Sequence, residues 1–437
     1  MGTGFGAHGG GKSGLLFSAL AMLSFSVNIC CSQGWQIASN LTLKADLAVR
    51  ETFDSNVYLQ DHDPSPTVTN AARPFRESMV TSVMPRLALE YKPSSQFNAL
   101  VSYSPEAVFY HSESSENHVT HRGLLNFNGT DNGVAWDQPN SFTWIDGEDK
   151  CLFFGAPGGA PALGGIPTRD RRDAFIYRGG FRATIPLGEW FVRPVASAYV
   201  HEFFTEQLNS RLPQYRGYEN YVDRSDVNGG LDIGHNIAPA TRIFAGYRYG
   251  YQNEGELITE PGIEYDNEYH RVLFGIEGQP WRWMKLNIAL GPEFHHSTAT
   301  TATNFDGNYS VLYVDASVTL MPTQKDSVTL AIKQFTQTAF ASCSVYEDTT
   351  YDIVWKHTFD SQWSAGAGFR AYNGDWLHPV RRNDWLYTVS AVVSRSINKH
   401  LSCEVSYLYD WADSLVSNTS GREYTRHLAS VALKGSF

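Results

Sequence analysis

Residues 401–411 have the sequence LSCEVSYLYDW, in which apolar and polar side chains alternate with a period of two. Apolar or aromatic side chains occupy every odd position from Leu401 to Trp411, and Glu404 and Asp410 lie between them. This pattern predicts a β-strand with one apolar face and one polar face. Ordinary strands have about five or six residues, whereas a tilted strand that crosses a membrane needs about nine to eleven. The stretch therefore has the length of a membrane-spanning strand.

The same long alternation recurs along the chain, which makes it the repeating unit of the fold. Further clear examples lie at residues 41–49, 83–91, 243–251, 312–320, 385–393 and 429–437. No comparable segment with the 3.6-residue period of an amphipathic helix follows residue 33. The sequence therefore predicts an all-β protein.

The connections between these segments alternate between short turns and long polar loops. Short turns are predicted at residues 92–96, 187–188, 238–240, 279–282, 322–325, 360–361 and 398–399. Long loops are predicted at residues 51–78, 206–225, 253–268, 297–308, 339–348, 373–383 and 412–421. Barrels of the bacterial outer membrane have short periplasmic turns and longer extracellular loops. The spacing thus predicts a transmembrane, antiparallel, up-and-down β-barrel.

The composition agrees with a barrel and excludes two other classes of protein. Only 18% of the 437 residues are charged, 14% are aromatic, and mean hydropathy is -0.31. No apolar run after the N-terminus is long enough for a membrane-spanning helix, and a net charge of -11 argues against a protein that binds nucleic acid. The aromatic excess is expected in two girdles at the membrane borders, with Tyr249 and Trp411 at one border and Trp190 and Trp281 at the other.

The first 32 residues are predicted to be a secretory signal peptide. A glycine-rich start that carries Lys12 precedes a mostly apolar run from Leu15 to Ile29, and small residues follow up to Ser32. The mature barrel is then expected to span residues 33–437.

The number of strands follows from the direction in which each strand runs. Seventeen segments can be marked, but single-chain bacterial barrels have an even number of strands. Turn lengths place the missing strand between residues 127 and 173, where Ser141–Ile145 is the best candidate. The sequence therefore predicts about 18 strands, with about 16 as the alternative, and both termini in the periplasm. In this arrangement residues 147–172 form the third extracellular loop.

The end of the chain carries a resemblance to a known class of protein. Residues 429–437 form a last alternating strand that ends in Phe437, and this tail resembles the recognition segment of bacterial outer-membrane β-barrels. Residues 52–57, with the sequence TFDSNV, follow the first strand and resemble the aromatic-Asp-x-Asn stretch of the β-barrel porin type 2 families. The resemblance implies a porin-like barrel in the outer membrane of a Gram-negative bacterium, with Phe437 as the assembly signal for the barrel assembly machinery.

Polar residues opposite the apolar stripes are expected to face the interior. We predict these basic residues to line a pore: Lys44, Arg50, Arg86, Arg182, Arg193, Arg248, Arg271, Lys333, Lys356 and Arg370. Basic residues outnumber acidic ones on these faces, which favours anionic solutes, unless facing charges pair and merely solvate the wall.

The third loop is a candidate constriction. It ends in Arg169, Asp170, Arg171 and Arg172, and in general porins the third loop folds into the pore. A flexible external loop is the other interpretation, and the sequence leaves both open.

The chain is predicted not to be an enzyme and to hold no metal or cofactor. His201-Glu202 lacks the second histidine of a zinc protease motif. His295 and His296 are adjacent on a strand, so they are expected to point to opposite faces and not to share an ion.

The function predicted from the sequence is passive diffusion of small hydrophilic solutes, with anions or saccharides favoured. The expected partners are outer-membrane lipid, the barrel assembly machinery and those solutes, with a homo-oligomer possible and no nucleic acid. Two alternatives remain open: a barrel that serves export or surface attachment of a polysaccharide, and a non-porous structural or adhesive barrel.

Overall fold

The computed structural model describes residues 34–60, 75–146, 173–209, 212, 220–339, 344–380, 382–415 and 423–437. The described part is almost entirely β-structure, and its one helix is a single 3-10 turn, Ser114–Glu116. No helix among these residues is long and apolar enough to cross a membrane. The signal peptide predicted at residues 1–32 and the third loop at 147–172 lie outside the described residues.

The strands are long, and most have 13 to 15 residues. Their bounds are β1 Trp35–Ala38, β2 Leu41–Asp54, β3 Ser78–Ser94, β4 Phe97–Tyr103, β5 Glu106–Tyr110, β6 His118–Asp131, β7 Val134–Asp146, β8 Ala174–Leu187, β9 Trp190–Phe203, β10 Arg224–Ala238, β11 Thr241–Glu254, β12 Asn267–Trp281, β13 Met284–Ser297, β14 Asn308–Leu320, β15 Asp326–Thr338, β16 Val345–Thr358, β17 Trp363–Trp376, β18 Asn383–Ser396, β19 Leu401–Ser414 and β20 Tyr424–Ser436.

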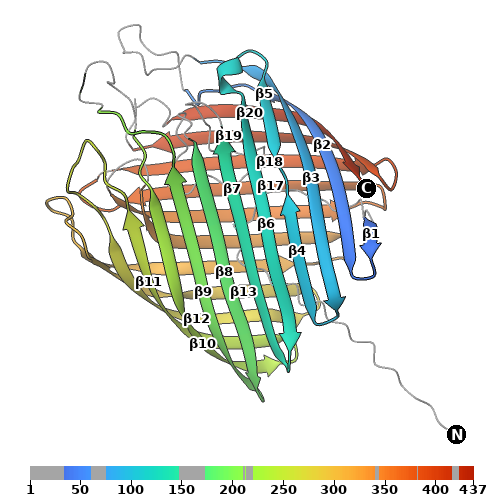
Figure 1. The fold of residues 1–437 in the computed structure, drawn as a ribbon, viewed down its shortest axis with the longest axis horizontal. Coiled ribbons are helices and arrows are strands. Elements are labelled where there is room, and N and C mark those ends of the chain that lie inside the picture. The colour runs from blue at the N-terminus through green and yellow to red at the C-terminus, as the bar shows by residue number, and fades with distance from the viewer. Residues whose placement is uncertain are drawn as a thin grey trace.

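These 20 strands form one closed, antiparallel sheet (Figure 1). Apart from β4 and β5, consecutive strands pair with each other, and β2 closes the barrel by pairing with both β3 and β20. β4 and β5 share one place between β3 and β6, and β1 pairs only with β2, so the wall has 18 strand positions. The 18-strand barrel predicted from the sequence is confirmed.

The strand inferred from the direction argument is β7. It contains the predicted segment Ser141–Ile145 and begins earlier, at Val134, directly after a tight turn. Asn132 and Gly133 form this turn with positive φ angles of 48° and 84°. An Asn-Gly pair between two alternating runs is a strong hairpin signal, because both residues tolerate positive φ. The strand is therefore longer than the predicted segment, and this Asn-Gly turn marks its true start.

The two ends of the chain meet at the closure of the barrel. β20 covers the edge of β2 from Asp54 to Asp46, and the Phe437 amide donates to the Ala45 carbonyl over 2.8 Å. β1 continues along the same edge by pairing with residues 41–43. β20 does not reach the first residues of β2, and β1 pairs with them instead. This pairing satisfies backbone groups that would be costly to leave unpaired in a bilayer.

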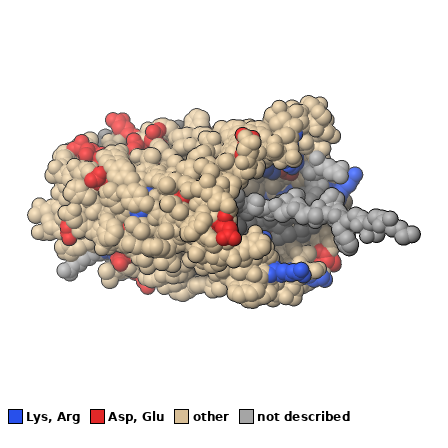
Figure 2. Space-filling view, turned by 90° about the horizontal axis from the view of Figure 1, so that it is seen from below, with Lys and Arg blue, Asp and Glu red and all other residues tan. Residues whose placement is uncertain are grey.

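The two faces of the wall differ as the alternation predicts. Apolar side chains such as Val405 (53% exposed) and Phe274 (59% exposed) point outward, and the predicted girdle residues Tyr249, Trp411 and Trp190 are exposed as well. On the side shown in Figure 2 most of the wall carries no charge, and charged side chains gather toward the two ends. This outer surface is suited to contact with lipid.

Candidate functional site: the barrel interior

All ten predicted pore-lining cations lie on the face opposite the exposed apolar side chains. Seven of them form ion pairs with carboxylates on neighbouring strands. These are Lys44, Arg86, Arg182, Arg193, Arg248, Arg271 and Arg370. Within the described ranges, Arg50, Lys333 and Lys356 form no ion pair; Lys333 lies 5.4 Å from the Phe335 ring instead. The interior thus combines paired charges with a few cations and several carboxylates, such as Asp226 and Asp410, that form no ion pair among the described residues.

The largest ion-pair cluster joins four adjacent strands, β9 to β12. Arg193 donates to Asp232 over 2.8 Å and to Glu277 over 2.6 Å, and its guanidinium lies 4.7 Å from the Phe244 ring. Arg248 also pairs with Asp232, over 2.6 Å. Arg193 and Asp232 are 2% and 1% exposed, so these charges are compensated within the wall and contribute little free charge to the pore.

Several inward carboxylates were missed from the sequence. Asp54 pairs with Arg426, Asp137 with Arg182, and Glu106 with Arg122. They were missed because each lies near a strand end or a strand break, where the limits of the alternating pattern are hard to set. Their presence makes the excess of positive charge smaller than the sequence suggests.

The segment that follows β2 folds into the barrel. Val57 and Leu59 have no exposed surface, and Leu59 has a positive φ of 52°. Leu59 packs against the inner faces of four strands at the opposite side of the closure, through Tyr372, Leu386, Ala412 and Tyr424. One narrowing of the barrel therefore comes from the first loop; Arg169, Asp170, Arg171 and Arg172 of the predicted third-loop constriction lie outside the described residues.

The inward turn is held by the residues that carry the porin type 2 resemblance. Asp54 accepts two hydrogen bonds from Arg426, at 2.9 and 2.5 Å, and a third from the Asn56 amide at 3.0 Å. The Asn56 side chain donates to the carbonyls of Gln60 at 2.7 Å and Thr425 at 2.8 Å. The Asp-Ser-Asn sequence thus fastens the first loop to β20 across the closure.

Tyr58 anchors the same segment to the other side of the mouth. It packs with Val80, Val108 and Tyr110 on β3 and β5, and its hydroxyl donates to Glu113 over 2.8 Å. Burial and this hydrogen bond raise the pKa of Tyr58 to about 12. The segment therefore crosses part of the mouth at the long-loop end and is fixed on both sides.

A second narrowing comes from β15 and β16. β14 and β15 pair at only seven positions, from Val314 with Gln334 to Leu320 with Val328, whereas β15 and β16 stay paired up to Thr338 with Val345. Beyond Gln334, β15 leaves β14 and bends inward. The barrel is therefore narrowed at the long-loop end by a strand pair as well as by a loop.

Side chains from β10 and β11 hold this bend. Arg224 donates to the Thr338 carbonyl over 2.7 Å, and Gln252 donates to the Thr336 carbonyl over 2.8 Å. In a regular β-ladder, backbone N–H groups of β14 would donate to β15 here. At the bend, side chains of Arg224 and Gln252 donate to the Thr338 and Thr336 carbonyls instead. Nothing local in the sequence signals this rearrangement.

The space between the bent strands and β12 to β14 is filled by a buried polar network. His295 hydrogen-bonds Glu293 and Asn267, both over 2.7 Å, and Glu293 pairs with Arg271. His296 is exposed and bonds Asn308 over 2.7 Å, so the two adjacent histidines do point to opposite faces. Among the described residues no three His, Cys, Asp or Glu side chains are grouped to hold a metal ion. The network joins β12 to β13 on their inner faces.

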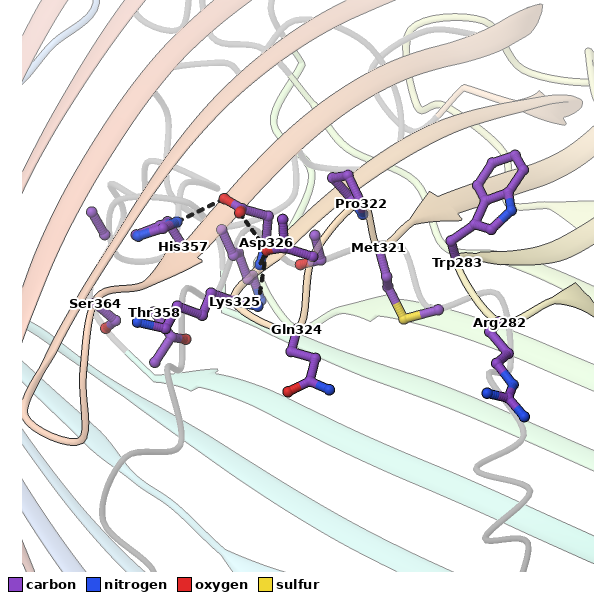
Figure 3. Close-up of a pocket in the computed structure, with 14 residues that line it drawn as sticks. Arg282, Trp283, Met321, Pro322, Gln324, Lys325, Asp326, His357, Thr358 and Ser364 are labelled. Atoms are coloured by element: carbon purple, nitrogen blue, oxygen red, sulfur yellow. Dashed lines mark hydrogen bonds and ion pairs between the residues drawn. The ribbon is translucent and has the colours of Figure 1, made fainter.

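A pocket of about 660 Å³ opens at the short-turn end of the barrel (Figure 3). It lies between the turn after β14 and the ends of β16 and β17, and Arg282, Lys325 and Lys356 line it. Lys325 donates to a backbone carbonyl over 2.8 Å, whereas Arg282 and Lys356 form no ion pair among the described residues.

The acidic group of this pocket, Asp326, is already engaged. Its carboxylate accepts hydrogen bonds from Thr323 over 2.6 Å and from Trp355 over 3.3 Å, and it pairs with His357 over 2.7 Å. The Ser364 hydroxyl is buried without a hydrogen-bond partner. The pocket thus offers free positive charge at the mouth opposite the long loops.

Comparisons with known proteins show distant likenesses of shape. No family model and no curated protein matches the chain. A solved structure of OccAB4 from Acinetobacter baumannii shares 9% identity over 91% of this chain and 99% of its own, with a TM-score of 0.41. OccK2 (OpdF) from Pseudomonas aeruginosa shares 9% identity over 90% and 98%, with a TM-score of 0.42. The siderophore receptor PiuA from Acinetobacter baumannii shares 8% identity over 92% and 82%, with a TM-score of 0.43. At identities of 8–9%, these likenesses do not assign the chain to a family.

Proposed function

We propose that this protein is a channel of the bacterial outer membrane through which small hydrophilic solutes diffuse passively. The observation that carries the proposal is a closed 18-strand wall with an apolar outer face and a charged inner face. A closed sheet satisfies its own backbone hydrogen bonds in lipid, and barrels of this strand number leave an aqueous lumen unless a segment fills it. The low charge of the chain and its exposed aromatic girdles support the same location.

The solutes are proposed to be small, with anions and saccharides favoured. Leu59 of the first loop and the inward bend at Thr338 both narrow the outer half, which argues against free passage of large molecules. Paired arginines and carboxylates present donors and acceptors side by side, which suits sugar hydroxyls, and Arg50 and Lys356 add free positive charge. A narrow, polar route of this kind supports selective diffusion.

The orientation belongs to the same proposal. The short turns and both termini face the periplasm, the long loops face outside, and residues 1–32 direct export and are removed. Phe437, at the end of the strand that closes the barrel, serves as the signal for the assembly machinery.

Conductance across a planar lipid bilayer tests the proposal. The full-length mature chain, refolded and checked for the gel shift on heating that marks a folded barrel, is expected to open discrete ion-conducting channels. Liposomes that contain the protein should swell with monosaccharides and disaccharides but not with long oligosaccharides. Folded protein without conductance would favour the non-porous barrel, and passage of long polysaccharides would favour a role in their export.

A further inference from the structure

Three pairs of tyrosine and histidine recur on the outward face of the barrel at its long-loop end. In each pair the tyrosine hydroxyl lies within hydrogen-bond distance of histidine Nδ1, at 2.7, 2.6 and 2.7 Å. The pairs, called here the Tyr–His pairs, are Tyr103–His121, Tyr247–His270 and Tyr407–His427. They lie on well-separated strand pairs, so the arrangement is repeated around the wall.

The three pairs share their position along the strand and a second aromatic ring. Each histidine is the fourth residue of a strand that runs away from the long loops, namely β6, β12 or β20. A second aromatic ring stands directly opposite it on a neighbouring strand: Trp144, Tyr249 or Tyr409, with ring centroids 5.6, 5.3 and 4.8 Å away. His121 therefore lies between rings on two strands, β4 and β7, whereas both rings beside His270 lie on β11 and both rings beside His427 lie on β19.

The Tyr–His pairs are open to the surroundings of the barrel. Tyr103, Tyr247 and Tyr407 are 48%, 47% and 44% exposed, and His270 and His427 are exposed as well. When the tyrosine hydroxyl donates to Nδ1, the proton of the ring lies on Nε2, which leaves an outward hydrogen-bond donor. On an otherwise apolar wall, a hydrogen-bond donor of this kind is satisfied when a polar group of the lipid accepts its hydrogen bond.

The level of the histidines matches the border of the membrane. A strand of 14 residues rises about 3.4 Å per residue, and with a tilt of about 40° it spans roughly 36 Å, against an apolar band of about 25 Å. A residue three positions from the strand end then lies roughly 8 Å below it, close to the edge of that band. Lipid phosphates lie just outside the hydrocarbon at this level.

Outward histidines at the short-turn end face acceptors, as does His111 at the long-loop end, which lies 3.6 Å from Glu51; the Tyr–His pairs differ from all of these. At the short-turn end, His235 lies 3.5 Å from Glu189, His357 lies 2.7 Å from Asp326, and His400 bonds a backbone carbonyl. The rings of these three histidines already have a carboxylate or carbonyl acceptor beside them. In the Tyr–His pairs, the partner of the ring is a tyrosine hydroxyl. The outer membrane is asymmetric too, since its outer leaflet consists of a phosphorylated glycolipid.

We propose that the Tyr–His pairs bind phosphate groups of the glycolipid headgroups in the outer leaflet. The inference rests on the proposed membrane location and orientation but not on the presence of an open pore. Nε2–H donates to a phosphate oxygen, while the flanking aromatic rings contact the sugar of the headgroup. Glu268, which accepts a hydrogen bond from Tyr249 over 2.8 Å, lies beside His270, so this pair binds phosphate less tightly than the other two.

Binding of diphosphoryl lipid A to the full-length mature barrel, counted by native mass spectrometry, tests the inference. The triple variant H121F/H270F/H427F keeps the aromatic rings and removes the donors, and we expect about tenfold weaker binding. H235F, an outward histidine at the other end, is the matched control and should bind like the parent. Folding of each variant is checked by the gel shift on heating.

Chemically dephosphorylated lipid A distinguishes phosphate recognition from sugar recognition. It should bind the parent as weakly as diphosphoryl lipid A binds the triple variant. Equal binding of both lipids by the parent, or unchanged binding by a folded triple variant, would overturn the inference. A barrel that binds the lipid but conducts no ions would instead refute the channel, so the two failures can be told apart.

Discussion

Asp54 is the residue on which the closure of the barrel and the inward first loop both depend. Its carboxylate accepts two hydrogen bonds from Arg426 and one from the backbone of Asn56. Asp54 and Arg426 are 1% and 4% exposed, so the pair is shielded from water. Removing one member leaves a buried charge without its partner, which costs more than the pair itself contributes.

We therefore expect Asp54→Asn to destabilise the barrel by about 3–5 kcal/mol. Urea unfolding of the detergent-solubilised barrel, followed by the gel shift on heating, measures the loss. Lys44→Gln is the matched control, because Lys44 pairs with Glu90 while 35% of its side chain is exposed; a loss below about 1 kcal/mol is expected there. Similar losses in the two variants would refute the special role of Asp54.

Lys356 and Arg282 carry free positive charge at the short-turn mouth. The double variant K356Q/R282Q is expected to lower the preference for anions, because the remaining acidic side chains at this mouth then weigh more. The reversal potential in a salt gradient across a planar bilayer reports this preference directly. Lys399→Gln, at a neighbouring short turn outside the pocket, should leave the potential unchanged, and an unchanged potential in the double variant would contradict the prediction.

At the scale of elements, the first loop and the bent β15–β16 pair narrow the barrel at its long-loop end. Val57 and Leu59 fix the loop to opposite sides of the mouth, and Arg224 holds the bend at Thr338. Neither narrowing requires a change in strand number. Both depend on contacts between residues far apart in the sequence.

Replacing Val57, Tyr58 and Leu59 by Gly, Ser and Gly is expected to raise single-channel conductance severalfold. The side chains that fill the mouth are removed, while Asp54 and Asn56 keep the start of the loop in place. Single-channel recordings at fixed salt concentration measure the change. If conductance stays at the parent value in a folded variant, the first loop does not limit the flow of ions.

At the scale of the whole molecule, the wall has one weak joint. β14 and β15 pair at seven positions, whereas β2 and β20 at the closure pair at nine and most neighbouring strands at twelve or more. Residues 309–313 of β14 pair with β13 along one edge of the strand. Along the other edge, no residue of β15 pairs with them. Backbone groups without a partner open more readily than those in a complete ladder.

Amide hydrogen exchange should therefore be fastest, within the wall, at β14 residues 309–313. We expect exchange there to exceed that of residues 285–290 on the adjacent β13 by about tenfold. Exchange followed by mass spectrometry on the barrel in nanodiscs separates the two peptides. Uniform protection along β14 would show that the joint is closed in the membrane.

The sequence by itself determined the architecture, because alternation with a period of two is a local property. Alternation showed which side chains of each strand point outward, as it does in residues 401–411. The lengths of the turns located the eighteenth strand between residues 127 and 173. The tertiary structure alone decided what fills the interior. The bend of β15 is set by donors from Arg224 and Gln252, and the fold of the first loop by Asp54 and Arg426, which are 372 residues apart. Alternation states only that a residue points inward; the partner it meets there depends on how the closed barrel brings distant strands together.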